Sequence, residues 1–186
     1  MAAAMRTALT VAGSDSGGGA GIQADLKSFA AVGVHGCSVV TCVTAQNTVG
    51  VRSIFPLPVR EIRAQLDAVL SDIPVHAAKT GMLYSADIVR AVADRLPPKV
   101  PLVVDPVMVA TVGASLQSEG FCGALLDRLV PRATLVTPNL HEASELAGFP
   151  VETVDGMRRA AKAIRGAGAK AVLVKGGHLK GGLVDL

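Results

Sequence analysis

The chain has 186 residues, of which 50% are hydrophobic, 18% are charged and 3% are aromatic. This length predicts one domain, and this composition excludes an intrinsically disordered chain, which would need low hydrophobicity and high net charge. The formal net charge of +3 and the absence of tryptophan argue against a nucleic-acid-binding surface, which needs a basic patch or aromatic stacking platforms. The longest apolar run has five residues, whereas a membrane-spanning helix needs roughly 20.

The cysteines are Cys37, Cys42 and Cys122, an odd number without the spacing of a disulfide framework. This usage predicts reduced thiols and a cytoplasmic protein. Cys37 and Cys42 lie five positions apart on a predicted strand, so their side chains point to opposite faces and are poorly placed to share a metal. We expect both to be small buried hydrophobic residues.

Short apolar runs alternate with helical patterns of about ten residues along the chain. In chain order, the predicted strands are 7–12, 38–45, 51–55, 75–80, 102–104, 134–137 and 171–175. The predicted helices are 22–32, 59–70, 86–96, 119–129, 140–147 and 154–165. This alternation predicts a single α/β domain over residues 1–186, with a mainly parallel central sheet and helices on both faces. In such a sheet, ligands bind beyond the carboxyl ends of the strands.

A glycine-rich loop, residues 13–21, follows the first predicted strand and precedes a helix. Its glycines would let backbone N–H groups approach a ligand, and the N-terminus of a helix favours anions. The loop lacks the Walker lysine, and the acid that a dinucleotide-binding fold needs about 20 residues later is missing. By itself it fits either a ligand-facing loop or a flexible connection. Asp25, near the start of the helix, is equally a dipole-stabilised acid or a substrate ligand.

Polar residues also follow the later strands. Gln46 offers a donor and an acceptor that suit the edge of a heterocycle, although turn chemistry would also explain it. Asp105 fits Mg²⁺ and phosphate chemistry or a capping role in its loop. Asn139 and Glu142 have the spacing of a helix capping box, and both could also bind a hydrated metal and phosphate. Lys175 could reach a phosphate or extend along the surface into solvent.

Together these segments resemble the signature of the hydroxymethylpyrimidine/phosphomethylpyrimidine kinases. The resemblance is carried by six blocks in order: AGSDSGGGAGIQADLK at 12–27, TAQNT at 44–48, KTGML at 79–83, DPVM at 105–108, TPN at 137–139 with Glu142, and VKGGH at 174–178. The blocks cover nearly the whole chain, so their order is far more specific than any one of them. The resemblance implies the ribokinase-like fold and a role in thiamine biosynthesis.

The resemblance also implies an activity and residue roles. The γ-phosphoryl group of ATP would move to the hydroxymethyl group of the pyrimidine, and then to the resulting monophosphate. The polar groups of the pyrimidine would be held by Gln46, Asp25 and Gly13, and its ring pocket would be lined by Ala20, Thr44, Met82 and Val107. Mg²⁺ and the ATP phosphates would be served by Asp105, Asn139, Glu142 and Lys175, with Asp105 and Glu142 as metal ligands. The resemblance suggests a homodimer.

The chain departs from the family it resembles in one respect. It contains no Gly-Thr-Gly-Cys loop, which in that family forms the anion hole and supplies the catalytic cysteine. No catalytic residue is therefore assigned, and none of the three cysteines is substituted for it. We expect the chain to be incomplete at its C-terminus. Two alternatives stay open: a pyridoxal kinase, against which Gln46 and Met82 argue, and a non-catalytic pyrimidine-binding module if the protein ends at residue 186.

Overall fold

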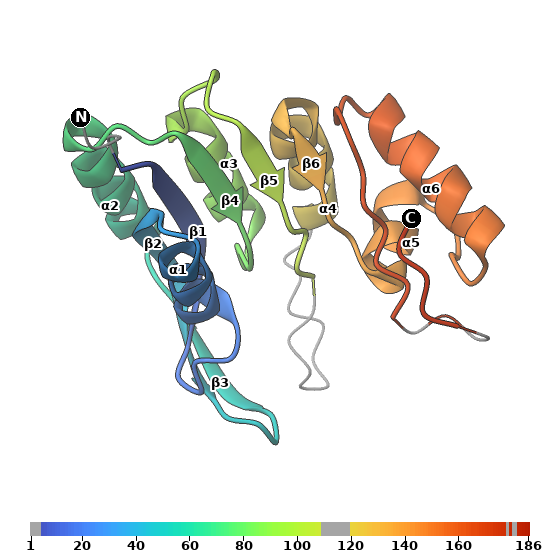
Figure 1. The fold of residues 1–186 in the computed structure, drawn as a ribbon, viewed down its shortest axis with the longest axis horizontal. Helices are drawn as coiled ribbons and strands as arrows, with labels where there is room; N and C mark the ends of the chain where they lie inside the picture. Colours follow the sequence, from blue (N-terminus) through green and yellow to red (C-terminus); the bar gives the residue numbers. More distant parts are fainter. Residues whose placement is uncertain (1–4, 109–119, 178, 180–181) are drawn as a thin grey trace.

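The computed structural model describes residues 5–108, 120–177, 179 and 182–186. Within these residues the centre is a six-stranded sheet with the order β3-β2-β1-β4-β5-β6 (Figure 1). The strands are β1 (Thr7–Asp15), β2 (His35–Gln46), β3 (Val51–Pro56), β4 (Ala77–Thr80), β5 (Leu102–Val104) and β6 (Leu135–Val136). Every neighbouring pair is parallel except β2 and β3, which form an antiparallel hairpin. The prediction of a mainly parallel sheet is confirmed.

Helices form at all six predicted positions. They are α1 (Gly21–Ala31), α2 (Val59–Asp72), α3 (Ala86–Arg95), α4 (Phe121–Ala124), α5 (Leu140–Ala147) and α6 (Val154–Gly166). The fourth predicted helix is not one regular α-helix, because α4 continues into the π-helical turn η1 (Leu125–Leu129) and the 3-10 turn η2 (Val130–Arg132). It starts after Gly120, whose φ is +81°. The first residue predicted for it, Glu119, lies outside the described residues.

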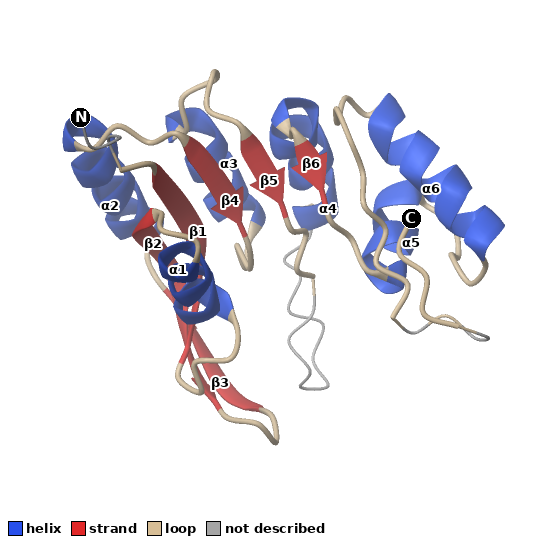
Figure 2. Ribbon diagram, in the orientation of Figure 1, coloured by secondary structure: helices blue, strands red, loops and turns tan. Residues whose placement is uncertain are grey.

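The helices lie on both faces of the sheet. The chain travels from β1 through α1 to β2, toward one edge of the sheet, and from β4 through α3 to β5, toward the other edge. Since crossovers between parallel strands are right-handed, these opposite directions place α1 and α3 on opposite faces. Figure 2 shows α1 in front of the sheet and α3 behind it. The prediction of helices on both faces is therefore confirmed.

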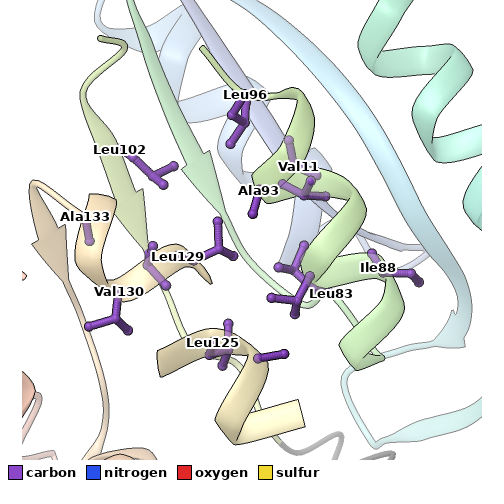
Figure 3. Packing of buried hydrophobic residues seen from close by; sticks show 14 of the residues in the cluster. Val11, Leu83, Ile88, Ala93, Leu96, Leu102, Leu125, Leu129, Val130 and Ala133 are labelled. Carbon is purple, nitrogen blue, oxygen red and sulfur yellow. The ribbon is translucent and has the colours of Figure 1, made fainter. Parts of the chain in front are cut away.

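The larger hydrophobic core joins the sheet to helices α2, α3 and α4. Figure 3 shows part of it, including Ile88 of α3 and Leu125 of η1. Ile62 and Leu66, one turn apart on α2, are fully buried in it, and burying a side chain of this size contributes about 1.5–3 kcal/mol. Ile88 and Val92 are likewise one turn apart on α3 and are buried in the same core. The hydroxyl of Ser85 caps this helix by accepting a bond from the N–H of Ile88 at 3.3 Å. This packing holds the strands in place and so sets the positions of the residues that follow them.

One predicted strand is wrong. Residues 171–175 do not form a strand: Val172 and Lys175 make only isolated parallel bridges, to Val136 and Asn139. The partner strand β6 is two residues long, and Pro138 follows it. Proline has no N–H to donate to a ladder, so regular pairing stops there. The carbonyl of Pro138 still accepts a bond from the N–H of Lys175 at 2.8 Å, which keeps the segment beside the end of the sheet.

The cysteine side chains are free thiols, as predicted. Cys37 and Cys42 are buried, and burial raises the pKa of both thiols above the ordinary value. Both are therefore small hydrophobic residues of the interior.

Among the helices that the structure describes, none combines the length and apolar character needed to cross a membrane.

Candidate active site

A cavity of about 390 Å³ opens where β1, β2, β4 and β5 end. Figure 1 shows the arrows of β4, β5 and β6 pointing in the same direction, so the carboxyl ends of these strands lie at the same end of the sheet. The seven residues predicted to hold or surround a pyrimidine all line this cavity: Gly13, Ala20, Asp25, Thr44, Gln46, Met82 and Val107. Asp105, predicted for the phosphate side, also lines it. The parallel strands thus bring residues from positions 13 to 107 into one space.

The glycine-rich loop is organised by Asp15, a buried residue at the end of β1. Its Oδ1 accepts a bond from the N–H of Gly17 at 2.7 Å, and its Oδ2 accepts bonds from Gly19 at 3.0 Å and Ala20 at 2.8 Å. Three N–H groups of the loop are therefore directed at a carboxylate of the chain itself. Asp15 was not among the predicted site residues, although an Asp just before a turn commonly bonds the following backbone.

The loop also depends on close backbone packing. A Cβ on Gly21, whose φ is +56°, would lie 2.3 Å from the carbonyl oxygen of Gly13. A side chain cannot fit there, so α1 can begin this close to β1 only with glycine. Gln23 strengthens the junction, because its Oε1 accepts a bond from the N–H of Asp15 and its Nε2 donates to Ser14 Oγ at 2.7 Å. The loop is therefore held in one shape beside the cavity.

Asp25 reaches the cavity from the first helix and forms an ion pair there. Lys79 Nζ lies 2.9 Å from Asp25 Oδ1 and 2.8 Å from Oδ2. The hydroxyl of Thr10 donates to the same Oδ2 at 2.6 Å. Thr10 and Lys79 face each other across β1 and β4, so two neighbouring strands and α1 meet at this carboxylate. In the sequence, Lys79 stands out only as part of the block KTGML at 79–83, which indicates no role for its side chain.

Gln46 ends β2 with its backbone bonded on both sides. Ser16 Oγ donates to the carbonyl of Gln46 at 2.6 Å and accepts from its N–H at 2.8 Å. The Thr44 hydroxyl lies 3.0 Å from the carbonyl oxygen of Ser14 and 3.3 Å from Gln46 Oε1. Backbone and side chain are both anchored, so the Gln46 amide enters the cavity in a defined orientation.

The residues predicted for phosphate and metal meet beyond β5 and β6. Lys175 Nζ donates to Asp105 Oδ1 at 2.9 Å, and the Thr137 hydroxyl donates to the same oxygen at 3.1 Å. Asp105 therefore connects the cavity with the segment that follows α6. His178, which the sequence places three residues after Lys175, lies outside the described residues.

Asn139 and Glu142 form the capping box that their spacing predicts. Asn139 Oδ1 accepts from the N–H of Glu142 at 2.9 Å, and Glu142 Oε2 accepts from the N–H of Asn139 at 2.8 Å. Glu142 is buried. Burial raises the pKa of its carboxyl above the ordinary value, and nearby Asp105 raises it further, whereas the N–H of Asn139 and the Lys175 ammonium lower it. The charge on Asp105 is thus close enough to act on Glu142.

The structure separates the predicted site residues into two groups. Seven line the cavity together with Asp105, whereas Asn139, Glu142 and Lys175 lie beyond its described lining and connect to it through Asp105. No cluster of three or more His, Cys, Asp or Glu side chains suited to a metal is found in the part of the chain that the structure describes.

Comparison with known proteins agrees with the resemblance. Residues 15–186 match the family described as phosphomethylpyrimidine kinase. The chain is 51% identical over 179 residues to a hydroxymethylpyrimidine/phosphomethylpyrimidine kinase of Synechococcus elongatus, covering 96% of this chain and 68% of that relative. The chain thus spans about two thirds of the length of the curated relatives it matches.

Solved structures give the same fold. A phosphomethylpyrimidine kinase from Clostridium difficile superposes with a TM-score of 0.86 at 46% identity, covering 97% of this chain and 79% of that one. A pyridoxal kinase from Staphylococcus aureus superposes with a TM-score of 0.88 at 36% identity, covering 99% and 68%. The fold is therefore the ribokinase-like α/β fold, and the sequence is more similar to the first of these two enzymes. The chain belongs to the phosphomethylpyrimidine kinase family.

Proposed function

We propose that the protein containing this chain transfers the γ-phosphoryl group of ATP to 4-amino-5-hydroxymethyl-2-methylpyrimidine, and then to its monophosphate, in thiamine biosynthesis. The observation that carries the proposal is the cavity, in which seven residues assigned to the pyrimidine gather beside Asp105. A cavity of about 390 Å³ suits a small heterocycle, since ligand pockets are typically about 300–1,000 Å³.

In this proposal the pyrimidine is held by its polar edge. The Gln46 amide, anchored by Ser16 and Thr44, offers one donor and one acceptor to the amino group and ring nitrogen of the substrate. Asp25 and the backbone of Gly13 would face the other polar groups of the pyrimidine. The apolar surface of the ring would pack against Ala20, Thr44, Met82 and Val107.

The phosphates would lie beside the ion pair of Asp105 and Lys175. Mg²⁺ prefers oxygen ligands and is usually bound by one or two carboxylates together with substrate phosphates. Asp105 and Glu142 supply donors of this kind, because both side chains are carboxylates and the Lys175 ammonium bonds only one oxygen of Asp105. When bound, Mg²⁺ would neutralise charge on the phosphates. Lys175 would contribute its ammonium to the same phosphates, and Asn139 would keep Glu142 in place through the capping box.

The test is a direct comparison of substrates with the full-length protein. Purified protein is incubated with MgATP and either the hydroxymethylpyrimidine or pyridoxal, and ADP release is measured. We expect faster turnover of the pyrimidine, with the diphosphate as the final product by mass spectrometry. Faster turnover of pyridoxal would establish the pyridoxal kinase alternative, and binding of the pyrimidine without ADP release would establish a non-catalytic binding module.

We also propose that the protein is a cytoplasmic homodimer. The hairpin of β2 and β3 extends away from the rest of the sheet (Figure 1), and β3 is its edge strand. Val49 and Phe55 on this hairpin are 92% and 68% exposed, and a protruding apolar edge strand suits pairing with a second copy. The free thiols suit a reducing compartment. Light scattering of wild type and Phe55→Glu should report a dimer and a weakened dimer.

A further inference from the structure

We propose that Lys79 is a positioning residue of the substrate cavity, which holds the Asp25 carboxylate in the orientation that binds the substrate. The inference rests on the proposed function, because it concerns how the same cavity recognises its ligand. Lys79 Nζ bonds both carboxylate oxygens of Asp25, at 2.9 and 2.8 Å. A carboxylate bonded through both oxygens to one ammonium has little freedom to rotate.

The fold leaves room for this lysine. Lys79 lies on β4 next to Thr10 of β1, and its side chain reaches past Gly81. A Cβ on Gly81 would lie 3.3 Å from Lys79 Nζ and 3.0 Å from the Cβ of Ala12. Glycine at position 81 therefore keeps the path of the ammonium open toward Asp25. The lysine side chain is 24% exposed and the Asp25 side chain 16%, so the pair is largely shielded from solvent.

The charge balance of the cavity gives Lys79 its importance. The described lining carries three carboxylates, on Asp15, Asp25 and Asp105, and a single ammonium, on Lys79. Asp15 is bonded by three N–H groups of the glycine loop, and Asp105 is paired with Lys175. Asp25 therefore depends on Lys79 for its cationic partner. Without it, a largely buried carboxylate would be left unpaired, which is unfavourable, and it would turn toward solvent.

The role of Lys79 differs from a purely structural contact between β4 and α1. Thr10 also bonds Asp25, and α1 packs on β1 and β2 independently of this pair. Removal of the ammonium should therefore leave the helix in place and disturb mainly the direction of the carboxylate. The expected consequence is weaker substrate binding with an unchanged ATP site.

A double-mutant cycle in the full-length protein tests this inference. Wild type, Lys79→Met, Asp25→Asn and the double variant are assayed with the hydroxymethylpyrimidine and MgATP. We expect Lys79→Met to raise the pyrimidine KM about tenfold or more, the size typical of a lost polar contact, and to leave the KM for ATP unchanged. The double variant should be no worse than Asp25→Asn alone, because residues that act through one another are not additive. Lys162→Met, at an exposed lysine of α6, is the control and should match wild type.

Two results would overturn the inference. One is a pyrimidine KM of Lys79→Met equal to that of wild type. The other is a double variant whose loss equals the product of the two single losses, which would mean that Lys79 acts independently of Asp25. If Lys79→Met does not fold, as a thermal melt would reveal, the comparison of Asp25→Asn with the double variant still decides the question, because neither leaves an unpaired carboxylate.

The same experiment distinguishes a wrong substrate assignment from a wrong role for Lys79. If wild type phosphorylates pyridoxal and not the pyrimidine, the proposed substrate is wrong, and the four proteins are compared with pyridoxal instead, with the same coupling expected between Lys79 and Asp25. If wild type phosphorylates neither compound, both the proposed function and the inference about Lys79 fail.

Discussion

Lys175 Nζ lies 2.9 Å from Asp105 Oδ1, although the two residues are 70 positions apart in the chain. Asp105 follows β5, and Lys175 lies in the segment after α6, which is held at the end of the sheet by isolated bridges. The pair places an ammonium beside a carboxylate that lines the cavity. Phosphoryl transfer depends mainly on positioning and neutralising charge, and these two groups are suited to that task.

The first prediction concerns Asp105. Asp105→Asn keeps the size of the side chain and an oxygen that can accept from Lys175, but removes the negative charge that a cation would bind. We expect kcat of the full-length protein to fall about 100-fold, the size of effect seen when one group that stabilises transition-state charge is removed. Steady-state assays over a range of Mg²⁺ concentrations measure it. Wild-type activity in the variant would leave Asp105 with a structural role only.

The second prediction concerns Gln46. Gln46→Leu fills a similar volume but removes the donor and acceptor, so the polar groups of the pyrimidine lose their partner. We expect the pyrimidine KM to rise about 10- to 100-fold, which corresponds to one or two lost hydrogen bonds, while the KM for ATP stays constant. Gln65→Leu is a control, since Gln65 bonds the backbone of Val40 rather than lining the cavity. A pyrimidine KM equal to that of wild type would refute the role of Gln46.

The third prediction concerns the pH dependence of stability through Glu142. Burial raises the pKa of this carboxyl in the folded protein. The folded state therefore holds its proton at pH values where the unfolded chain has lost it, so this contribution to stability declines as pH rises from the unfolded pKa through the folded pKa. Glu142→Gln keeps a capping-box residue and cannot ionise. Its stability relative to wild type should increase as pH rises from about 4 to 7.

Urea unfolding of both proteins without divalent cations measures this difference. The unfolding free energies should be closest at the acidic end of the range and diverge in favour of Glu142→Gln toward neutrality. A relative loss of stability of Glu142→Gln with rising pH would contradict the raised pKa.

The fourth prediction concerns Asp15. Asp15→Asn replaces one of the two carboxylate oxygens with an NH₂ group, which cannot accept a hydrogen bond. The loop N–H groups that donate to that oxygen in wild type would lose their acceptor. We expect the free energy of unfolding to fall by about 1.5–3 kcal/mol, the range for a hydrogen bond to a charged group. Asp72→Asn, at an exposed position of α2, should change it by less than about 0.5 kcal/mol. Equal stabilities of the two variants in urea unfolding would show that Asp15 does not organise the loop.

The fifth prediction concerns Thr80, whose buried hydroxyl has no hydrogen-bond partner among the described residues. Thr80→Val has nearly the same shape and removes an unsatisfied polar group, so the unfolding free energy should rise by about 1 kcal/mol. Thr10→Val, at an equally buried position on the neighbouring strand, should instead be destabilising, because the Thr10 hydroxyl bonds Asp25. Two thermal melts decide between these signs. A lower melting temperature for Thr80→Val would disprove the prediction.

The sequence alone determined the order of strands and helices, the glycine loop, the capping box of Asn139 and Glu142, and the family. These features depend on residues near one another in the chain, where apolar periodicity and side-chain caps act locally. It also predicted a strand at 171–175, which is wrong because a strand needs a long enough partner and β6 offers two residues followed by Pro138.

Only the tertiary structure decided which charged residues meet. Asp25 pairs with Lys79, 54 positions away, because β1 and β4 are neighbouring strands and α1 packs against β1. Asp105 pairs with Lys175, 70 positions away, because isolated bridges hold the segment after α6 beside the end of the sheet. Such contacts follow from strand order and side-chain direction in three dimensions, which no local pattern in the sequence encodes.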